Sequence, residues 1–172
     1  MVEHSTFPGE RKMCHVTTRT DTPWLSPEQQ RNWRLFLGGI TVLMDQLDRD
    51  LRTKHNLSMG EYEILVRLSE APKRSIRMAE LAAAVAHSRS RVTHTISRLE
   101  RDGIVRRDTC SDDGRGVSAV LTDHGFSVLE KAAHTHVRGV HEYLIENAPD
   151  DEFDVVGRIM ERVIQTLHGK RF

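Results

Sequence analysis

Cysteine is scarce in this chain: only Cys14 and Cys110 occur among 172 residues, and they do not form a C-x-x-C pair. Two cysteines are too few for a disulfide scaffold, so a reducing compartment is the simplest location for the protein. Aromatic residues make up only 5% of the chain, which predicts a core of Leu, Val, Ile, Met and Ala. No apolar run approaches the roughly 18 residues that span a bilayer, and the first residues lack the pattern of a secretory signal. These absences favour a cytoplasmic protein with no membrane partner.

Motifs of common enzyme classes are also missing. The chain contains no G-x-S-x-G elbow, no P-loop, no H-E-x-x-H and no dinucleotide-binding glycine fingerprint. We therefore expect that the protein is not an enzyme and that it uses no cofactor.

The formal net charge is zero, but the charges are unevenly distributed. Residues 72–107 contain nine basic and three acidic side chains, whereas residues 146–161 are predominantly acidic. A local excess of positive charge suits contact with nucleic-acid phosphates better than the neutral total suggests. The distribution predicts that one end of the molecule faces DNA.

Apolar residues recur at helical spacing along most of the chain, and capping residues mark where helices begin. Ser26 and Ser58 are such starts, Thr122 caps a later helix, and Gly103 ends a basic one. We expect a flexible arm, then helices over residues 27–54, 59–71, 78–86, 88–102, 122–147 and from 150 onward. Two β-prone runs, residues 104–108 and 117–121, are expected to pair as a hairpin. The predicted fold is mainly α with a small β-hairpin wing.

The helices at 78–86 and 88–102 are separated by a tight turn, which is the arrangement of a helix-turn-helix. The second helix and the hairpin resemble the MarR family of bacterial regulators. The segment MAELAAAVAHSRSRVTHTISRLERDGIVRR looks like that family's helix-turn-helix and first wing strand, and Asp113-Gly-Arg115 followed five residues later by Leu121-Thr122 matches its D-x-R-x5-L-T wing signature. Gly125 fits the glycine that commonly follows. The resemblance covers roughly residues 27–168.

The resemblance implies a division of the chain into three parts. Residues 1–25 would be the flexible N-terminal arm, residues 26–56 and 123–172 a helical dimerisation region, and residues 57–122 a winged helix-turn-helix DNA-binding domain. It also implies a homodimer that represses transcription from a pseudo-palindromic operator on double-stranded DNA. A small aromatic or anionic effector would release the dimer from DNA.

The first half of a recognition helix points toward base edges in the major groove. Val92 and Ile96 should face the core, which leaves the polar residues of this helix for DNA. An arginine at the wing tip suits a narrow minor groove, where negative potential is concentrated. The predicted DNA-binding residues are Ser88, Arg89, Ser90, Arg91, Thr93, His94, Arg98 and Arg115. Further phosphate contacts are expected from Arg74, Arg77, Arg106 and Arg107.

An effector pocket would lie between the first long helix, the second helix and the helix after the wing. Arginine suits a carboxylate ligand and aromatic side chains suit a ring. The predicted ligand-binding residues are Trp33, Arg34, Phe36 and Tyr62, although the apolar ones also suit a core.

Two alternative functions remain open at this point. Oxidation of Cys110 beside Arg106 and Arg107 would make a redox-sensing regulator, because neighbouring cations favour the thiolate. An architectural DNA-binding protein would need no effector. No metal site is expected, although the chain offers scattered candidate ligands: His55, Glu130, His134, His136 and His141.

Overall fold

The computed structural model describes residues 22–85, 89–109 and 116–168. Four residues for which the sequence predicted a role or a motif lie outside the described residues, namely Ser88, Cys110, Asp113 and Arg115. The arm up to residue 21, which includes Cys14, also lies outside them. The side chain of Arg89 also lies outside them.

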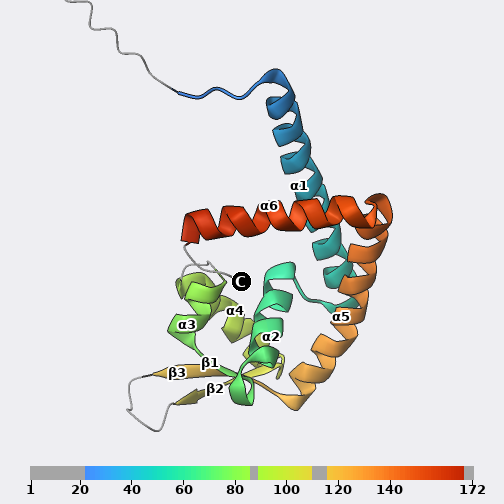
Figure 1. Ribbon diagram of the computed structural model, residues 1–172. Coiled ribbons are helices and arrows are strands. Elements are labelled where there is room, and N and C mark those ends of the chain that lie inside the picture. The colour runs from blue at the N-terminus through green and yellow to red at the C-terminus, as the bar shows by residue number, and fades with distance from the viewer. Residues whose placement is uncertain (1–21, 86–88, 110–115, 169–172) are drawn as a thin grey trace, which may run out of the picture.

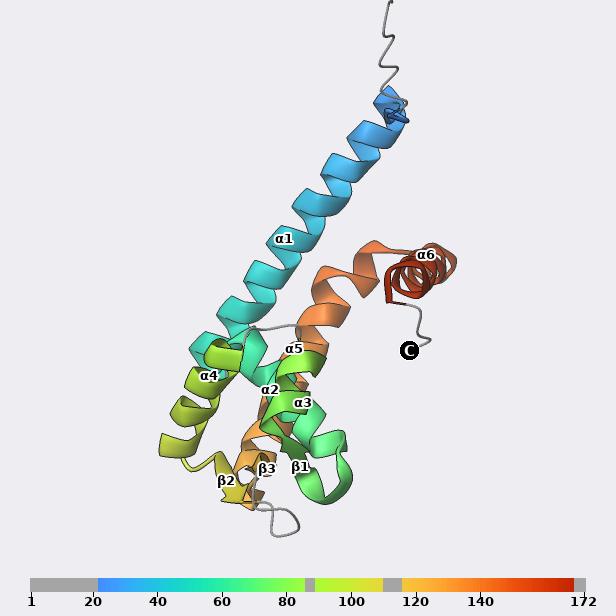
Figure 2. The ribbon, with the colours of Figure 1, turned by 90° about the vertical axis from the view of Figure 1, so that its left-hand side faces the viewer.

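Helix α1, Pro27–His55, begins at a complete capping box. The Ser26 hydroxyl accepts from the amide of Gln29, and the Gln29 side chain accepts from the amide of Ser26. The expected start of this helix at Pro27 is confirmed. The sequence could predict it because the two residues of the cap are only three positions apart. The C-terminal half of α1 packs on the body of the chain, whereas its N-terminal half projects away from it (Figure 2).

Three shorter helices follow: α2 (Met59–Glu70), α3 (Met78–Ala84) and α4 (Arg89–Arg101). Ser58 caps α2 through a second complete capping box with Glu61. At the end of α4, Gly103 adopts φ 69°, a left-handed conformation that glycine tolerates without steric cost. The expected helix-turn-helix order is confirmed, and Figure 1 shows α3 and α4 beside α2.

The wing is a three-stranded antiparallel sheet in the order β1-β3-β2. The expected hairpin is present as β2 (Val105–Thr109) and β3 (Val117–Leu121). The sequence did not predict the third strand, β1 (Ser75–Arg77), which follows a short 3-10 turn, η1 (Pro72–Arg74). This strand of three residues pairs with β3, so that Ile76 lies opposite Ala119.

Helix α5, Asp123–Tyr143, leads from the wing back to α1, and its start at the Thr122 cap agrees with the sequence. The expected helix to residue 147 is interrupted, because α5 ends at Tyr143 and a separate 3-10 turn, η2, spans Ile145–Asn147. Helix α6, Asp150–His168, follows; it overlaps α1 in the view of Figure 1, but Figure 2 shows that most of it stands away from α1. Within the described residues, no helix is both long and apolar enough to cross a membrane.

The core lies among α2, α3, α4, the wing and the adjoining parts of α1 and α5. Its fully buried side chains are aliphatic, as the low aromatic content predicts; the largest are Leu51, Leu57, Ile64, Leu65, Leu68, Leu81, Ile96 and Leu99. Two helical segments contribute little to it. The N-terminal half of α1 and most of α6 leave large apolar side chains exposed, including Phe36, Ile40, Phe153 and Val156.

Candidate nucleic-acid interface

Helix α4 has one face in the core and an opposite face in solvent. Val92, Ile96 and Leu99 are buried at the spacing of three and four residues that places them on one side of a helix. Four predicted DNA-binding residues on the helix are exposed: Ser90, Arg91, Thr93 and His94. Arg101, which the sequence analysis left out, is also exposed, and its separation of seven residues from His94 places it on the same face.

Arg98 lies on α4 but is held by groups outside that helix. Its Nε donates to Glu61 Oε1 at 2.5 Å, and its Nη2 donates to Glu61 Oε2 at 2.7 Å and to the carbonyl oxygen of Asn56 at 2.9 Å. Asn56 is the C-cap residue directly after α1, and Glu61 is in the first turn of α2. Arg98 therefore ties the candidate recognition helix to the corner between α1 and α2, and its predicted contact with DNA remains a prediction.

Arg107 reaches α4 from the wing. Its Nη1 donates to Glu100 Oε2 at 2.6 Å, and its Nη2 donates to Ser97 Oγ at 2.9 Å and to the carbonyl oxygen of Thr93 at 3.2 Å. The backbone amide of Arg107 also donates to Glu100 Oε1 at 3.1 Å. The strand and the helix are thus joined through both the main chain and the side chain of one residue.

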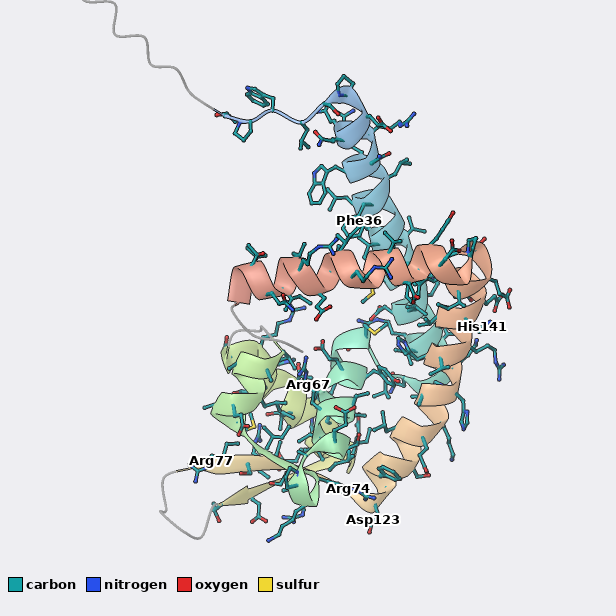
Figure 3. The ribbon with its side chains drawn as sticks, viewed as in Figure 1. Phe36, Arg67, Arg74, Arg77, Asp123 and His141 are labelled. Carbon is teal, nitrogen blue, oxygen red and sulfur yellow. The ribbon has the colours of Figure 1, made fainter. Side chains whose placement is uncertain are left out.

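The other basic residues expected to meet phosphates differ in their surroundings. Arg74 pairs with Asp123 at 3.1 Å and stacks over the ring of Phe126 at 3.9 Å, so it connects the turn before β1 to the start of α5 (Figure 3). Arg106 is exposed and pairs with Asp108 on its own strand at 2.8 Å. Arg77 is exposed at the end of β1 (Figure 3).

The four predicted ligand-binding residues are not brought together within one chain. Trp33 and Arg34 line a hollow near the start of α1, together with Leu25 and Leu37. The Phe36 ring stacks with Trp33 at 6.1 Å between centroids, but Phe36 lines a different hollow, between α1 and α6. Tyr62 belongs to the core instead.

Tyr62 lies where α1, α2 and α5 meet, and two histidines lie there with it. The Tyr62 and His136 rings are 4.7 Å apart, and His55 Nε2 lies 2.7 Å from Thr135 Oγ1. Burial raises the pKa of the Tyr62 hydroxyl and lowers the pKa of His136, because the charged forms are disfavoured away from water. Burial and then the charges of Lys54 and Lys131 lower the pKa of His55. Nδ1 of His136 is buried without a hydrogen-bond partner among the described residues.

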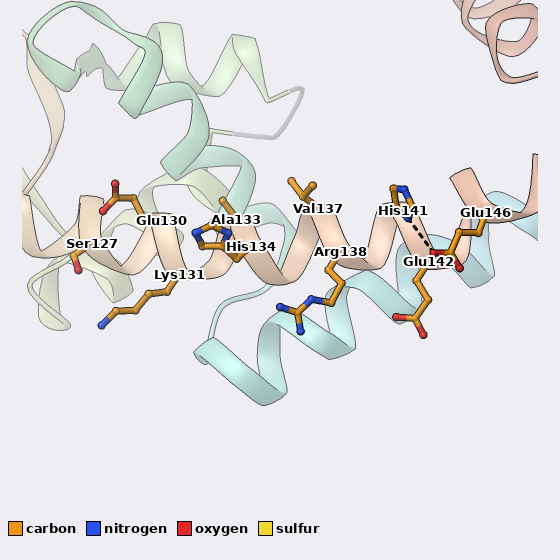
Figure 4. Close-up of a pocket in the computed structure, with 10 residues that line it drawn as sticks. All are labelled: Ser127, Glu130, Lys131, Ala133, His134, Val137, Arg138, His141, Glu142 and Glu146. Carbon is orange, nitrogen blue, oxygen red and sulfur yellow. Dashed lines mark hydrogen bonds and ion pairs between the residues drawn. The ribbon is translucent and has the colours of Figure 1, made fainter. Parts of the chain in front are cut away.

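An open groove follows the outer face of α5 (Figure 4). It carries both signs of charge, with Lys131 and Arg138 beside Glu130 and Glu142. His141 Nδ1 lies 3.1 Å from Glu146 Oε1 at one end of the groove. The described part of the chain contains no cluster of three or more histidine, cysteine or acidic residues that could hold a metal ion.

Known proteins share this arrangement. The sequence profile of the MarR family matches residues 57–117. Sco3205, a MarR family transcriptional regulator from Streptomyces coelicolor with a crystal structure in complex with DNA, is 38% identical, with a TM-score of 0.80, over 86% of this chain and 92% of that chain. AbsC, a MarR family transcriptional regulator from the same organism, is 37% identical, with a TM-score of 0.80, over 87% of this chain and 100% of that chain. The HTH-type transcriptional repressor YetL of Bacillus subtilis (strain 168) is 26% identical over 156 residues, which cover 91% of this chain and 93% of YetL.

Proposed function

Because this chain belongs to the MarR family of transcriptional regulators, we propose that it binds double-stranded DNA as a homodimer and represses transcription from a pseudo-palindromic operator. Membership of a family of transcriptional regulators agrees with the expectation that the protein is not an enzyme. The observation that carries the proposal is the exposed polar face of α4 beside the wing, in a chain 38% identical to a regulator with a solved DNA complex.

The predicted residues have complementary roles in this proposal. Arg91, Thr93 and His94 would contact base edges in the major groove, because they lie on the exposed side of the helix in its N-terminal half. Ser88, Arg89, Ser90 and Arg98 complete the proposed helix contacts. Arg115 would enter the minor groove from the wing.

The homodimer is supported by apolar surface that one chain leaves uncovered. Phe153, Val156 and Val163 are exposed at intervals of three and seven residues along α6, and Phe36 and Ile40 are exposed on α1. Contiguous exposed apolar side chains on helices indicate a protein interface. A second copy suits these faces, because a twofold dimer would present two α4 helices to two half-sites of an operator.

We also propose that a small aromatic or anionic effector releases the dimer. The hollow at Trp33 and Arg34 pairs an aromatic ring with a guanidinium, which suits an aromatic carboxylate. Because the N-terminal half of α1 projects from the chain, a second chain would be needed to enclose such a ligand. Tyr62 would then contact a ligand at a different place, the junction of α1, α2 and α5, where Nδ1 of His136 has no hydrogen-bond partner among the described residues.

The test is a comparison of duplexes. The full-length protein would select operator sequences from a pool of random duplexes, and its affinity for the selected duplex would be compared with that for a scrambled one. A repressor of this family should prefer the selected duplex by at least about 10³-fold, whereas equal affinity for both would indicate an architectural DNA-binding protein. Arg115→Ala should weaken operator binding by about 1–3 kcal/mol if the wing enters the minor groove.

Two additions to the binding assay separate the modes of control. Benzoate and its hydroxylated derivatives should release the protein from its selected duplex if the effector is an aromatic anion. Release by mild peroxide, abolished in Cys110→Ser, would instead support the redox-sensing alternative.

A further inference from the structure

Arg107 occupies a position between the two elements that would read DNA. It belongs to strand β2 of the wing, and every acceptor of its side-chain hydrogen bonds described above lies on α4. We infer that Arg107 is a positioning residue, which holds the recognition helix at a set angle to the wing and acts on DNA only through that helix. The inference rests on the proposed DNA-binding function and assigns this basic residue a role other than phosphate contact.

The acceptors of the Arg107 side chain lie on one face of α4 and cover nearly two turns of the helix. Thr93, Ser97 and Glu100 follow one another at intervals of four and three residues, so they lie on one face and span about 10 Å of helix axis. Nη2 reaches Ser97 and Thr93 together, because the Ser97 hydroxyl donates to the Thr93 carbonyl oxygen at 2.9 Å, while Nη1 reaches Glu100. The compact ammonium of lysine lacks this fork of donors in fixed directions.

The main chain strengthens this connection. The Glu100 carboxylate accepts from the Arg107 amide and from the Arg107 side chain, so the strand itself is held against the helix. Arg107 lies opposite Ala119 of the central strand β3, which in turn pairs with β1. A movement of the hairpin would therefore be transmitted to Thr93, which lies in the half of α4 proposed to read bases.

The neighbouring residue provides a matched control. Arg106 carries the same charge, but alternate residues of a strand point to opposite faces of a sheet, and the described contact of its side chain is the ion pair with Asp108. Arg106 is therefore available for phosphate contact in a way that Arg107 is not. A comparison of variants at these two adjacent arginines should therefore distinguish the effect of positioning the helix from the effect of losing a positive charge.

The experiment uses the full-length protein, its selected operator duplex and a scrambled duplex of the same length. Affinities of Arg107→Ala, Arg107→Lys and Arg106→Ala would be measured at several salt concentrations, and each value would be corrected for the folded fraction. Arg107→Ala should weaken operator binding about tenfold, as expected for the loss of charge-assisted hydrogen bonds that set the helix angle. Its affinity for the scrambled duplex and the salt dependence of operator binding should stay unchanged, and Arg107→Lys should not restore the affinity.

Three results would overturn the inference. If Arg107→Ala weakens both duplexes equally and lowers the salt slope by about 0.9 per lost contact, Arg107 contacts phosphate. If the folded variant binds the operator as well as the wild type does, the contacts serve stability alone. If Arg107→Lys restores full affinity, the charge suffices and the fork geometry is not needed.

A double variant covers the case in which Arg107→Ala does not fold. Ser97→Ala combined with Glu100→Gln removes an acceptor and a charge while retaining Arg107, and it should reduce the preference for the operator in the same way. Failure of the proposed function itself is distinguishable, because the wild-type protein would then show no operator preference for any variant to lose.

Discussion

The guanidinium of Arg98 forms a bidentate ion pair with the carboxylate of Glu61, with donor–acceptor distances of 2.5 and 2.7 Å. Glu61 is only 6% exposed, and it also accepts from the amide and the hydroxyl of Ser58. One carboxylate therefore caps α2 and anchors α4. A movement at the corner between α1 and α2 reaches the candidate recognition helix through this pair.

Removing Arg98 should destabilise the fold. Arg98→Ala leaves the Glu61 carboxylate buried without its ionic partner, so the free energy of unfolding should fall by about 2–3 kcal/mol, less than for a fully buried pair because Arg98 is partly exposed. Denaturant unfolding followed by circular dichroism measures this change. Arg67→Ala is the control, since it breaks an exposed pair with Glu63 that should contribute less than about 0.5 kcal/mol. Equal losses in the two variants would contradict the anchoring role of Arg98.

Gly125 should not tolerate a methyl group. A Cβ at this position would lie 2.0 Å from the carbonyl oxygen of Ile104, which is held by hydrogen bonds from the amide and hydroxyl of Thr122. Gly125→Ala should therefore lower the free energy of unfolding by about 3 kcal/mol through overpacking. Gly157→Ala is the control, because its Cβ meets nothing within 4 Å of the same chain and should stabilise α6 by up to about 1 kcal/mol. Denaturant unfolding of both variants under the same conditions measures these changes. A Gly125→Ala variant with an unchanged free energy of unfolding would contradict the described packing.

Stability should fall as the pH drops below about 6.5, where a histidine in the unfolded chain takes up a proton. Burial lowers the pKa of His136 in the folded state, and the pKa of His55 is lowered too, so the folded protein resists protonation that the unfolded chain accepts. The contribution of these two histidines to the free energy of unfolding is fully present above the pKa that histidine has in the unfolded chain. It is lost as the pH falls toward their lower pKa values in the folded state. His136→Phe, which keeps a ring beside Tyr62, should flatten the decline between pH 7 and 5 by at most about 1.4 kcal/mol per pH unit.

The control for this pH dependence is His134→Gln on the exposed side of α5. Unfolding measured at several pH values should give the wild-type profile for His134→Gln and a flatter one for His136→Phe. Identical profiles for His136→Phe and the wild type would remove His136 from the explanation.

A charge on the apolar face of α6 should separate the proposed dimer. Val156 is exposed in one chain between Phe153 and Val163, and a carboxylate there would be buried without a partner between two chains at a cost of several kcal/mol. Val156→Glu should therefore behave as a monomer in sedimentation equilibrium and should lose operator affinity. Arg158→Glu adds a carboxylate on the opposite face of α6 and should remain dimeric. A dimeric Val156→Glu would show that α6 does not form the interface.

The helix starts were predictable because their signals are local. Ser26, Ser58 and Thr122 each cap a helix through a contact three residues away, and all three starts lie where the sequence placed them. Strand β1 had no such signal. Its three residues are a strand only because β3, more than 40 residues later, offers an edge with which they pair.

The residues of the candidate sites also differ in how far the sequence could predict them. The alternation of Val92 and Ile96 with polar residues was enough to predict which side of the basic helix is exposed, and Ser90, Arg91, Thr93 and His94 lie on that side. The four residues proposed for the effector were chosen by type alone, and one chain places Tyr62 apart from Trp33 and Arg34.

The positions of the helices and the hairpin follow from local signals, since caps, turns and apolar periodicity depend on residues within a few positions of one another. The carboxylate that each arginine meets depends instead on how the elements pack against one another. Arg98 meets Glu61 across 37 positions of chain, and the adjacent Arg106 and Arg107 pair with Asp108 on their own strand and with Glu100 on α4. The reason is that a side chain's electrostatic partner is set by the elements that pack around it, and residue type alone carries no record of that packing.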